Sequence, residues 1–170
     1  MSSKRNWFDW ERAFSGSKQY PMRLFTLETE QWFPQTLETL FPFFADAANL
    51  EQLTPPWLHF RILSQPVEMR EGAQILYRLR LHGVPLRWQS EITAWEPPFR
   101  FVDTQIRGPY RAWIHEHAFE SRDGKTVMRD RVQYGVVGGS LIQKFLVVPD
   151  LSKIFEFRRI RLASLFGSTQ

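Results

Sequence analysis

The feature that most constrains the fold is a run of alternating strand patterns between residues 73 and 134. Hydrophobic and polar residues alternate within each segment, and turn-forming residues separate the segments. Strands are expected over 73–81, 84–95, 99–107, 110–121 and 126–134. The connections are short, and Asp123-Gly124 is the clearest hairpin signal among them. Consecutive strands joined in this way pair antiparallel, so the run predicts one antiparallel sheet.

Helices and further strands are expected on either side of this run. The expected elements before it are a strand over 22–31, a helix over 36–48, a short helix over 50–54 and a strand over 57–64. After Gly138-Gly139, apolar residues follow helical spacing, and Pro149 is expected to kink or divide this long helix. A sheet with one apolar face must cover it, and the C-terminal helix is the only large element available. The pattern therefore predicts an α+β fold.

The length of the chain suits a single domain. Its 170 residues support one substantial core, and no repeats or low-complexity linkers divide it. Residues 1–20 are polar and charged with interspersed aromatics, so they are assigned as an N-terminal extension to a domain over 21–170. Trp7, Trp10 and Phe14 have helical spacing, which predicts a short helix lying on the domain. A membrane-surface segment is the alternative.

Charge and composition narrow the classes of partner. The net charge is +4, but the basic residues are scattered, so we interpret them as a solvated surface and expect no nucleic-acid partner. No apolar run is long enough to span a membrane, and the N-terminus does not resemble a signal peptide. The absence of cysteine excludes disulfides and thiolate metal sites. A cytoplasmic protein is the resulting expectation.

The turn at Gly108-Pro109 decides which side chains share the inner face of the sheet. A three-residue turn places Asp103 across from His115, and Phe101 across from His117. A two-residue turn would place both histidines on the opposite face from Asp103. The three-residue register groups the large aromatics and leaves most long charged side chains outside, so it is the predicted register.

The inner face predicted from this register combines aromatic walls with a polar cluster. Its aromatic and apolar members are Tyr77, Trp88, Phe101, Trp113, Phe119, Met128 and Tyr134, and its polar members are Ser90, Asp103, Gln105, His115, His117 and Asp130. Buried polar groups cost free energy unless they are paired, so this cluster needs partners within itself or in a ligand. Apolar walls with a few convergent polar groups are typical of small-molecule sites. These residues are the candidate site, and its expected occupant is a small hydrophobic or aromatic molecule.

Several segments carry a family resemblance. They are 49–57, 77–81, 85–88 and 101–110, followed by Trp113, His115, His117, Phe119, Asp130, Val132, Tyr134, Ile154, Phe155 and Arg158. In these segments the chain resembles one branch of the START-like, or SRPBCC, ligand-binding superfamily, which includes polyketide cyclases. The resemblance covers the chain from about residue 22 onward. It implies a helix-grip fold, in which a curved antiparallel sheet wraps a long C-terminal helix around a deep cavity.

The residues of the polar cluster support three interpretations. Asp103 and Asp130 can orient the two histidines in a structural network. Two histidines and a carboxylate can also hold zinc or iron with an open coordination position. Alternatively, His115 or His117 can act as the acid or base of an enzyme, with Asp103 orienting it. The structural network is preferred over the metal, so no metal or cofactor is expected.

The resemblance predicts a broad class of function but no specific ligand or reaction. Members of the superfamily typically bind or carry lipids, sterols, hormones or polyketides, and a minority catalyse cyclisation or dehydration. The first hypothesis is therefore binding of a largely apolar or aromatic metabolite. The second is a cyclase- or dehydratase-like enzyme, and the third is an interaction domain with a filled core. The sequence leaves open whether the chain is an enzyme, which ligand it binds and its oligomeric state.

Overall fold

A single curved sheet of seven strands forms the centre of the computed structural model, which describes residues 23–64 and 67–168. The strands are β1 (Phe25–Phe33), β2 (Arg61–Ile62), β3 (Gln74–Leu81), β4 (Val84–Glu96), β5 (Arg100–Arg107), β6 (Ala112–Arg122) and β7 (Lys125–Gly135). Their order in the sheet is β1-β7-β6-β5-β4-β3-β2, and every neighbouring pair is antiparallel. The expected sheet is confirmed. The expected extension over 1–20 lies outside the described residues.

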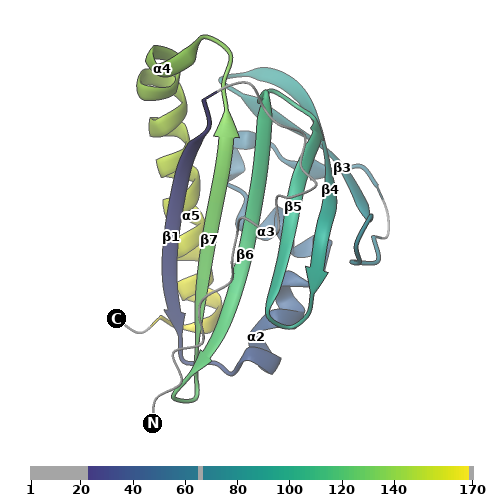
Figure 1. Cartoon of the computed structure of the whole chain (residues 1–170), viewed down its shortest axis with the longest axis vertical. Coiled ribbons are helices and arrows are strands. Elements are labelled where there is room, and N and C mark those ends of the chain that lie inside the picture. Colours follow the sequence, from purple (N-terminus) through teal and green to yellow (C-terminus); the bar gives the residue numbers. More distant parts are fainter. Residues whose placement is uncertain (1–22, 65–66, 169–170) are drawn as a thin grey trace.

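The helices lie on one side of this sheet. Four short elements lie between β1 and β2: α2 (Leu37–Phe44), η1 (Ala47–Asn49), α3 (Leu50–Leu53) and η2 (Pro56–Leu58). After β7 the chain forms α4 (Gly139–Ile142), the π-helical turn η3 (Gln143–Val147) and the long helix α5 (Val148–Phe166). Figure 1 shows α5 running along the concave side of the sheet. This is the helix-grip arrangement that the sequence predicts.

The register between neighbouring strands determines where the residues of the polar cluster lie. In the β5–β6 pair, Phe101 lies opposite His117 and Asp103 lies opposite His115, as predicted. The side chain of Gln105 helps to hold the connecting loop, because its Nε2 donates a hydrogen bond to the carbonyl oxygen of Tyr110 at 2.7 Å. The β4–β5 pair has two register irregularities, and such bulges increase the local twist of a sheet. The bulges therefore contribute to the curvature that encloses the helix.

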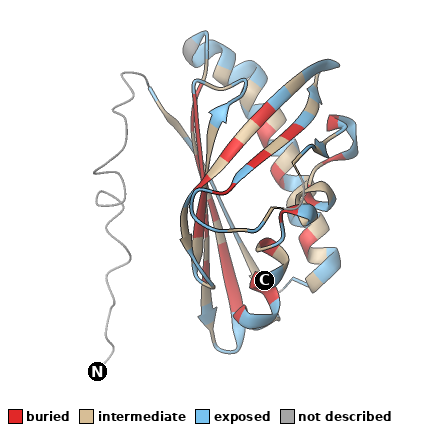
Figure 2. Cartoon of the chain, turned by 90° about the vertical axis from the view of Figure 1, so that its right-hand side faces the viewer, coloured by how far each residue is buried: buried red, intermediate tan, exposed pale blue. Residues whose placement is uncertain are grey.

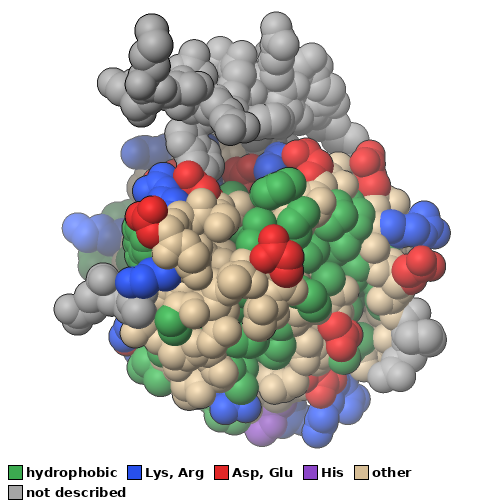
Figure 3. All heavy atoms as spheres, turned by 90° about the horizontal axis from the view of Figure 1, so that it is seen from below, with side chains coloured by type: hydrophobic (Ala, Val, Ile, Leu, Met, Phe, Trp, Pro, Cys, Tyr) green, Lys and Arg blue, Asp and Glu red, His purple; other side chains and the backbone are tan. Residues whose placement is uncertain are grey.

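The core lies between the inner face of the sheet and the helices. Figure 2 shows buried residues along the strands and on the helices that lie beside the sheet. The predicted apolar face of α2 is confirmed, since Leu37, Leu40, Phe41 and Phe44 are all buried. The lower end of the molecule in Figure 1 is seen directly in Figure 3, where hydrophobic, acidic and basic side chains are interspersed. The described residues visible on that face form no single-sign patch of charge.

The expected strand over 57–64 is wrong for most of its length. Pro56–Leu58 forms a 3-10 helix, and only Arg61–Ile62 pairs with β3. Two consecutive prolines precede this segment, and His59 ends the 3-10 helix in the left-handed region at φ 44°. An extended strand cannot begin until the chain has left this turn.

The C-terminal helix is divided near Pro149, as expected. The π-helical turn η3 lies directly before Pro149, and α5 continues beyond it. Figure 1 shows α4 beyond the end of the sheet. Leu141 and Phe145 are therefore exposed, at 71% and 66%, although their spacing resembles that of a core-facing stripe. Among the described residues, no helix is long and apolar enough to cross a membrane.

Candidate functional site

A cavity of about 200 Å³ lies between the inner face of the sheet and the helices. The inner faces of β3 to β6 form one wall, and the segment from α2 to Phe60 forms another. The loop at Tyr110 and one face of α5 complete the enclosure, with Leu151, Ile154 and Phe155 contributed by the helix. Most of the lining side chains are apolar. The sheet therefore supplies a rigid wall, and the last helix closes it.

Aromatic rings make up the sheet wall of the cavity. The ring of Trp88 stacks on Tyr77 at a centroid distance of 5.8 Å and contacts Trp113 edge-on at 5.3 Å. The indole Nε1 of Trp88 donates a hydrogen bond to Ser90 Oγ at 3.1 Å, and the Tyr77 hydroxyl lies 3.4 Å from the same oxygen. Burial is the main reason that the pKa of Tyr77 lies well above its ordinary value. The hydroxyl of Tyr77 is therefore protonated at neutral pH.

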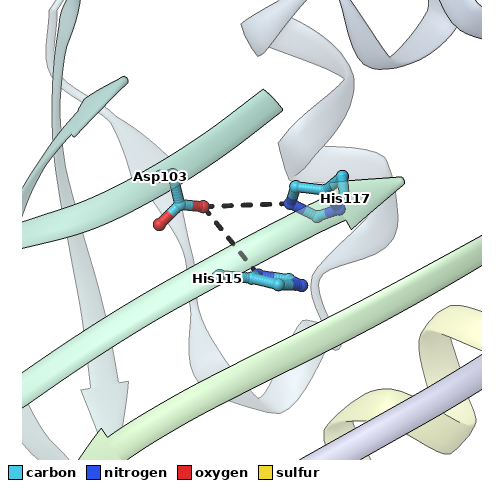
Figure 4. A group of neighbouring side chains, drawn as sticks. All are labelled: Asp103, His115 and His117. Atoms are coloured by element: carbon cyan, nitrogen blue, oxygen red, sulfur yellow. Dashed lines mark ion pairs between the residues drawn. The ribbon is translucent and has the colours of Figure 1, made fainter. Parts of the chain in front are cut away.

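A cluster of charged and titratable groups interrupts this wall. Figure 4 shows Asp103 on one strand facing His115 and His117 on the next. The Oδ2 atom of Asp103 lies 3.8 Å from His115 Nδ1 and 4.0 Å from His117 Nε2. Both histidines are almost fully buried, and all three side chains line the cavity.

Asp130 on β7 lies behind the two histidines. Its Oδ1 is 3.2 Å from His115 Nε2 and 2.5 Å from His117 Nδ1. Arg158 on α5 approaches the other oxygen, with its Nε 3.6 Å from Asp130 Oδ2. Each imidazole therefore has one nitrogen toward Asp130 and the other toward Asp103.

Burial and neighbouring charges have opposing effects on the pKa values of the buried residues in this cluster. Burial and the neighbouring His117 lower the pKa of His115. Burial would also lower the pKa of His117, but the nearby carboxylates of Asp130 and Asp103 outweigh it and raise that pKa. Burial opposes ionisation of Asp130, yet Arg158 and the histidines hold its pKa well below the ordinary range. Asp130 is thus a buried carboxylate that stays ionised because of its partners.

The structure brings most of the predicted site residues to the cavity. Those that line it are Tyr77, Trp88, Ser90, Phe101, Asp103, Trp113, His115 and His117. Four other residues of the candidate site lie on the inner side of the sheet but do not line this cavity: Gln105, Phe119, Met128 and Tyr134.

Three of these side chains have other partners. Gln105 bonds to the loop at Tyr110, and Phe119 packs against Phe41 and Phe44 of α2. The hydroxyl of Tyr134 accepts a hydrogen bond from Gln143. Alternation identifies the face of a strand, but the position of the helices decides which part of that face borders the cavity.

Met128 and Asp130 border a second cavity and not the main one. The second cavity has a volume of about 210 Å³, lies between β1, β7 and α5, and is bordered by Phe155 and Arg158 as well. Asp130 therefore reaches the main cavity only through the histidines.

Arg158 and Tyr110 are site residues that the candidate list lacks. Arg158 lines both cavities and approaches Asp130, although the helical pattern placed it with the other residues of an amphipathic helix. Tyr110 lies between Trp113 and Trp88, and burial is the main reason that its pKa is raised. A lone arginine at an otherwise apolar helix position and an aromatic residue beside a Gly-Pro turn are the signals that were available in the sequence.

Comparison with known proteins identifies the fold. No protein-family model and no curated protein matches the chain. A START superfamily protein from Mycobacterium smegmatis is 14% identical, with 82% of this chain and 98% of that chain covered and a TM-score of 0.61. Protein CV1439 from Chromobacterium violaceum is 15% identical, with 84% and 98% covered and a TM-score of 0.66. The major latex-like protein 151 of Panax ginseng is 8% identical, with 84% and 97% covered and a TM-score of 0.61.

Proposed function

We propose that this chain, whose fold is that of START superfamily proteins, binds a small and largely apolar molecule that carries one hydrogen-bonding group. The observation that supports this most directly is a mainly apolar, aromatic-walled cavity interrupted by a cluster of buried polar side chains. Small-molecule sites combine these two features, because apolar walls supply affinity and a few polar groups fix orientation.

The volume of the cavity limits the size of the molecule. Its 200 Å³ is somewhat more than the volume of about 150 Å³ at which an apolar protein cavity binds benzene. The aromatic rings of Tyr77, Trp88 and Trp113 offer flat surfaces on which another ring can stack or pack edge-on. A ligand of one or two fused rings suits this space.

Asp103 indicates the polar group that the ligand carries. Among the described residues, nothing donates a hydrogen bond to its buried Oδ1 atom. An unsatisfied buried acceptor costs about 1–3 kcal/mol, more when it is charged. Asp103 lines the cavity, so a ligand hydroxyl is expected to donate to its carboxylate, and the cavity is suited to an aromatic alcohol or phenol.

The experiment compares two ligands that differ only in that hydroxyl. Titration of the protein with 2-naphthol, followed by calorimetry, is expected to give saturable binding at one site. Naphthalene is expected to bind about tenfold more weakly, because it forms no hydrogen bond with the polar cluster. Equal affinities for the two compounds would contradict the assignment of the hydroxyl.

A pair of variants on α5 tests the location of the site. Ile154 lines the cavity, whereas Ile160 on the same helix is 55% exposed. The I154W variant is expected to lose most of the affinity for 2-naphthol because the indole occupies the cavity. The matched I160W variant is expected to bind like the wild type. Undiminished binding by a correctly folded I154W would place the ligand elsewhere and overturn the proposal.

An acid–base enzyme is the second candidate function, favoured by the ring nitrogens that face the cavity. His115 Nδ1 and His117 Nε2 both point toward Asp103 beside the space that a ligand would fill. In a dehydration, one group removes a proton from the carbon next to a carbonyl, and another donates a proton to the departing hydroxyl. The test incubates the protein with an aromatic β-hydroxy ketone and follows the conjugated ketone by absorbance. Turnover that is absent from H115Q and retained by H82Q would support this candidate, and no turnover by the wild type would exclude it for this substrate class.

A further inference from the structure

The strongest unexplained feature of the cavity is the convergence of three electron-pair donors. Asp103 Oδ2, His115 Nδ1 and His117 Nε2 approach one another, and the three ligand atoms all lie within 4.8 Å of each other. Each comes from a rigid strand, since Asp103 lies on β5 and both histidines lie on β6. The arrangement is therefore preformed by the register of the sheet.

Asp130 determines which nitrogens carry hydrogen. Its ionised Oδ1 lies next to His115 Nε2 and His117 Nδ1, and a carboxylate favours an N–H on each nitrogen that faces it. In a neutral imidazole, the other nitrogen then has a free electron pair. The two free pairs of His115 and His117 point toward the Asp103 carboxylate. A cation between these atoms, whether a proton or a metal ion, is stabilised by all three of them.

The charges of the cluster also favour a cation at this position. The cluster contains two carboxylates, those of Asp103 and Asp130, and one guanidinium, that of Arg158. A divalent cation on the Asp103 side adds positive charge where Arg158 does not reach. An uncompensated buried charge is costly, so a cation stabilises the cluster as well as filling it.

We propose that Asp103, His115 and His117 form a binding site for a divalent transition-metal ion, with its open coordination positions facing the cavity. Two imidazoles and one carboxylate are a common ligand set for zinc and for non-haem iron. A point central to the three donor atoms lies within about 2.8 Å of each, so each ligand needs to move by roughly half an ångström to reach a normal bond length of about 2.0–2.2 Å.

The surroundings of the histidines match those of known metal sites. A metal-bound histidine almost always donates its second N–H to a carboxylate, a carbonyl or water, which fixes the orientation of the ring. Here Asp130 supplies that carboxylate to both rings, and Arg158 holds Asp130 in turn. The sequence favoured a structural network in which Asp103 and Asp130 orient the two histidines. The contacts with Asp103, at 3.8 and 4.0 Å, are longer than hydrogen bonds, so the inner nitrogens can still bind a metal ion. The metal site does not depend on the proposed apolar ligand, although both use one cavity.

The experiment measures zinc binding to the full chain, produced without a polyhistidine tag and stripped with a chelator. Calorimetry is expected to show one Zn²⁺ per chain. The D103N and H117Q variants are expected to weaken binding by about 100-fold or more, since even outer partners of metal ligands contribute about 10- to 100-fold. H82Q is the matched control, because His82 forms an exposed pair with Asp150 outside the cavity and its loss is expected to leave zinc affinity unchanged. Zinc affinity that is unaffected by D103N and H117Q would overturn the proposal.

A second measurement uses the wild type and so does not depend on whether a variant folds. In ¹⁵N spectra of histidine side chains, zinc is expected to shift Nδ1 of one histidine and Nε2 of another. This pattern is specific, because His115 approaches Asp103 through Nδ1 and His117 through Nε2. Zinc that shifts neither nitrogen would exclude the site. The zinc-free protein is expected to bind 2-naphthol still, so failure of the metal site and failure of the ligand proposal give different results.

Discussion

Among the described residues, histidine lies beside aspartate in two places, one of them exposed and the other buried. His82 and Asp150 are 2.6 Å apart, but the side chain of His82 is 66% exposed. The histidines of the cavity are separated from Asp130 by comparable distances, yet they are almost completely buried. Water and salt screen the first pair, whereas burial leaves the second much less screened. A short distance alone therefore does not identify a site; burial and convergence on a cavity do.

The largest expected effect is a difference in the free energy of unfolding between variants of Asp130 and Asp150. In metal-free protein, D130N is expected to lower the free energy of unfolding by about 3–5 kcal/mol, because it leaves the buried Arg158 without its carboxylate partner. D150N is expected to lower it by less than about 1 kcal/mol, as is usual for exposed pairs. Urea denaturation of both variants measures the difference. Similar losses in the two variants would mean that burial does not distinguish the pairs.

A smaller effect is expected from the arginine that completes the buried cluster. R158M is expected to lower the free energy of unfolding of metal-free protein by about 1.5–3 kcal/mol, because Asp130 loses a charged partner but keeps both histidines. Arg159, which pairs with Glu156 on the outside of the same helix, supplies the control. R159M is expected to leave the urea midpoint unchanged. If R158M also left the urea midpoint unchanged, Arg158 would not stabilise the ionised Asp130.

The smallest expected effect is a change with salt concentration in the loss of stability that D150N and D130N cause. Raising sodium chloride from low concentration to about 1 M shortens the screening length from tens of ångströms to about 3 Å. The cost of D150N, measured as a difference from the wild type, is expected to shrink toward zero under this change. The cost of D130N is expected to stay the same, because salt does not enter the core. Equal salt dependence of both costs would show that water reaches the buried cluster.

The sequence predicts the sheet and the polar cluster well, because both depend on local alternation. Residues at every second position of β6 must share a face, so His115 and His117 are placed together by the period of a strand. The register between β5 and β6 follows from one turn, and grouping the aromatics selects the correct length for it. A pairing of Asp103 with His115 is therefore accessible from the sequence alone.

Contacts between a helix and the sheet are not accessible in the same way. Helical spacing shows that Arg158 and Leu141 belong to amphipathic stretches, but not where the helix crosses the sheet. In the structure Arg158 lies over β7 beside Asp130, whereas Leu141 projects beyond the sheet and is exposed. The segment around His59 fails for another reason, since two prolines and a left-handed residue override its apolar pattern.

The position of α5 in the chain has a consequence for synthesis. This helix follows every strand, so the ribosome releases the complete sheet before it releases the wall that closes the cavity. Until then, Asp130 has no arginine beside it and the aromatic rings of β3 to β6 face water. Docking of α5 thus brings Arg158 to Asp130 and closes the cavity in the same step of folding.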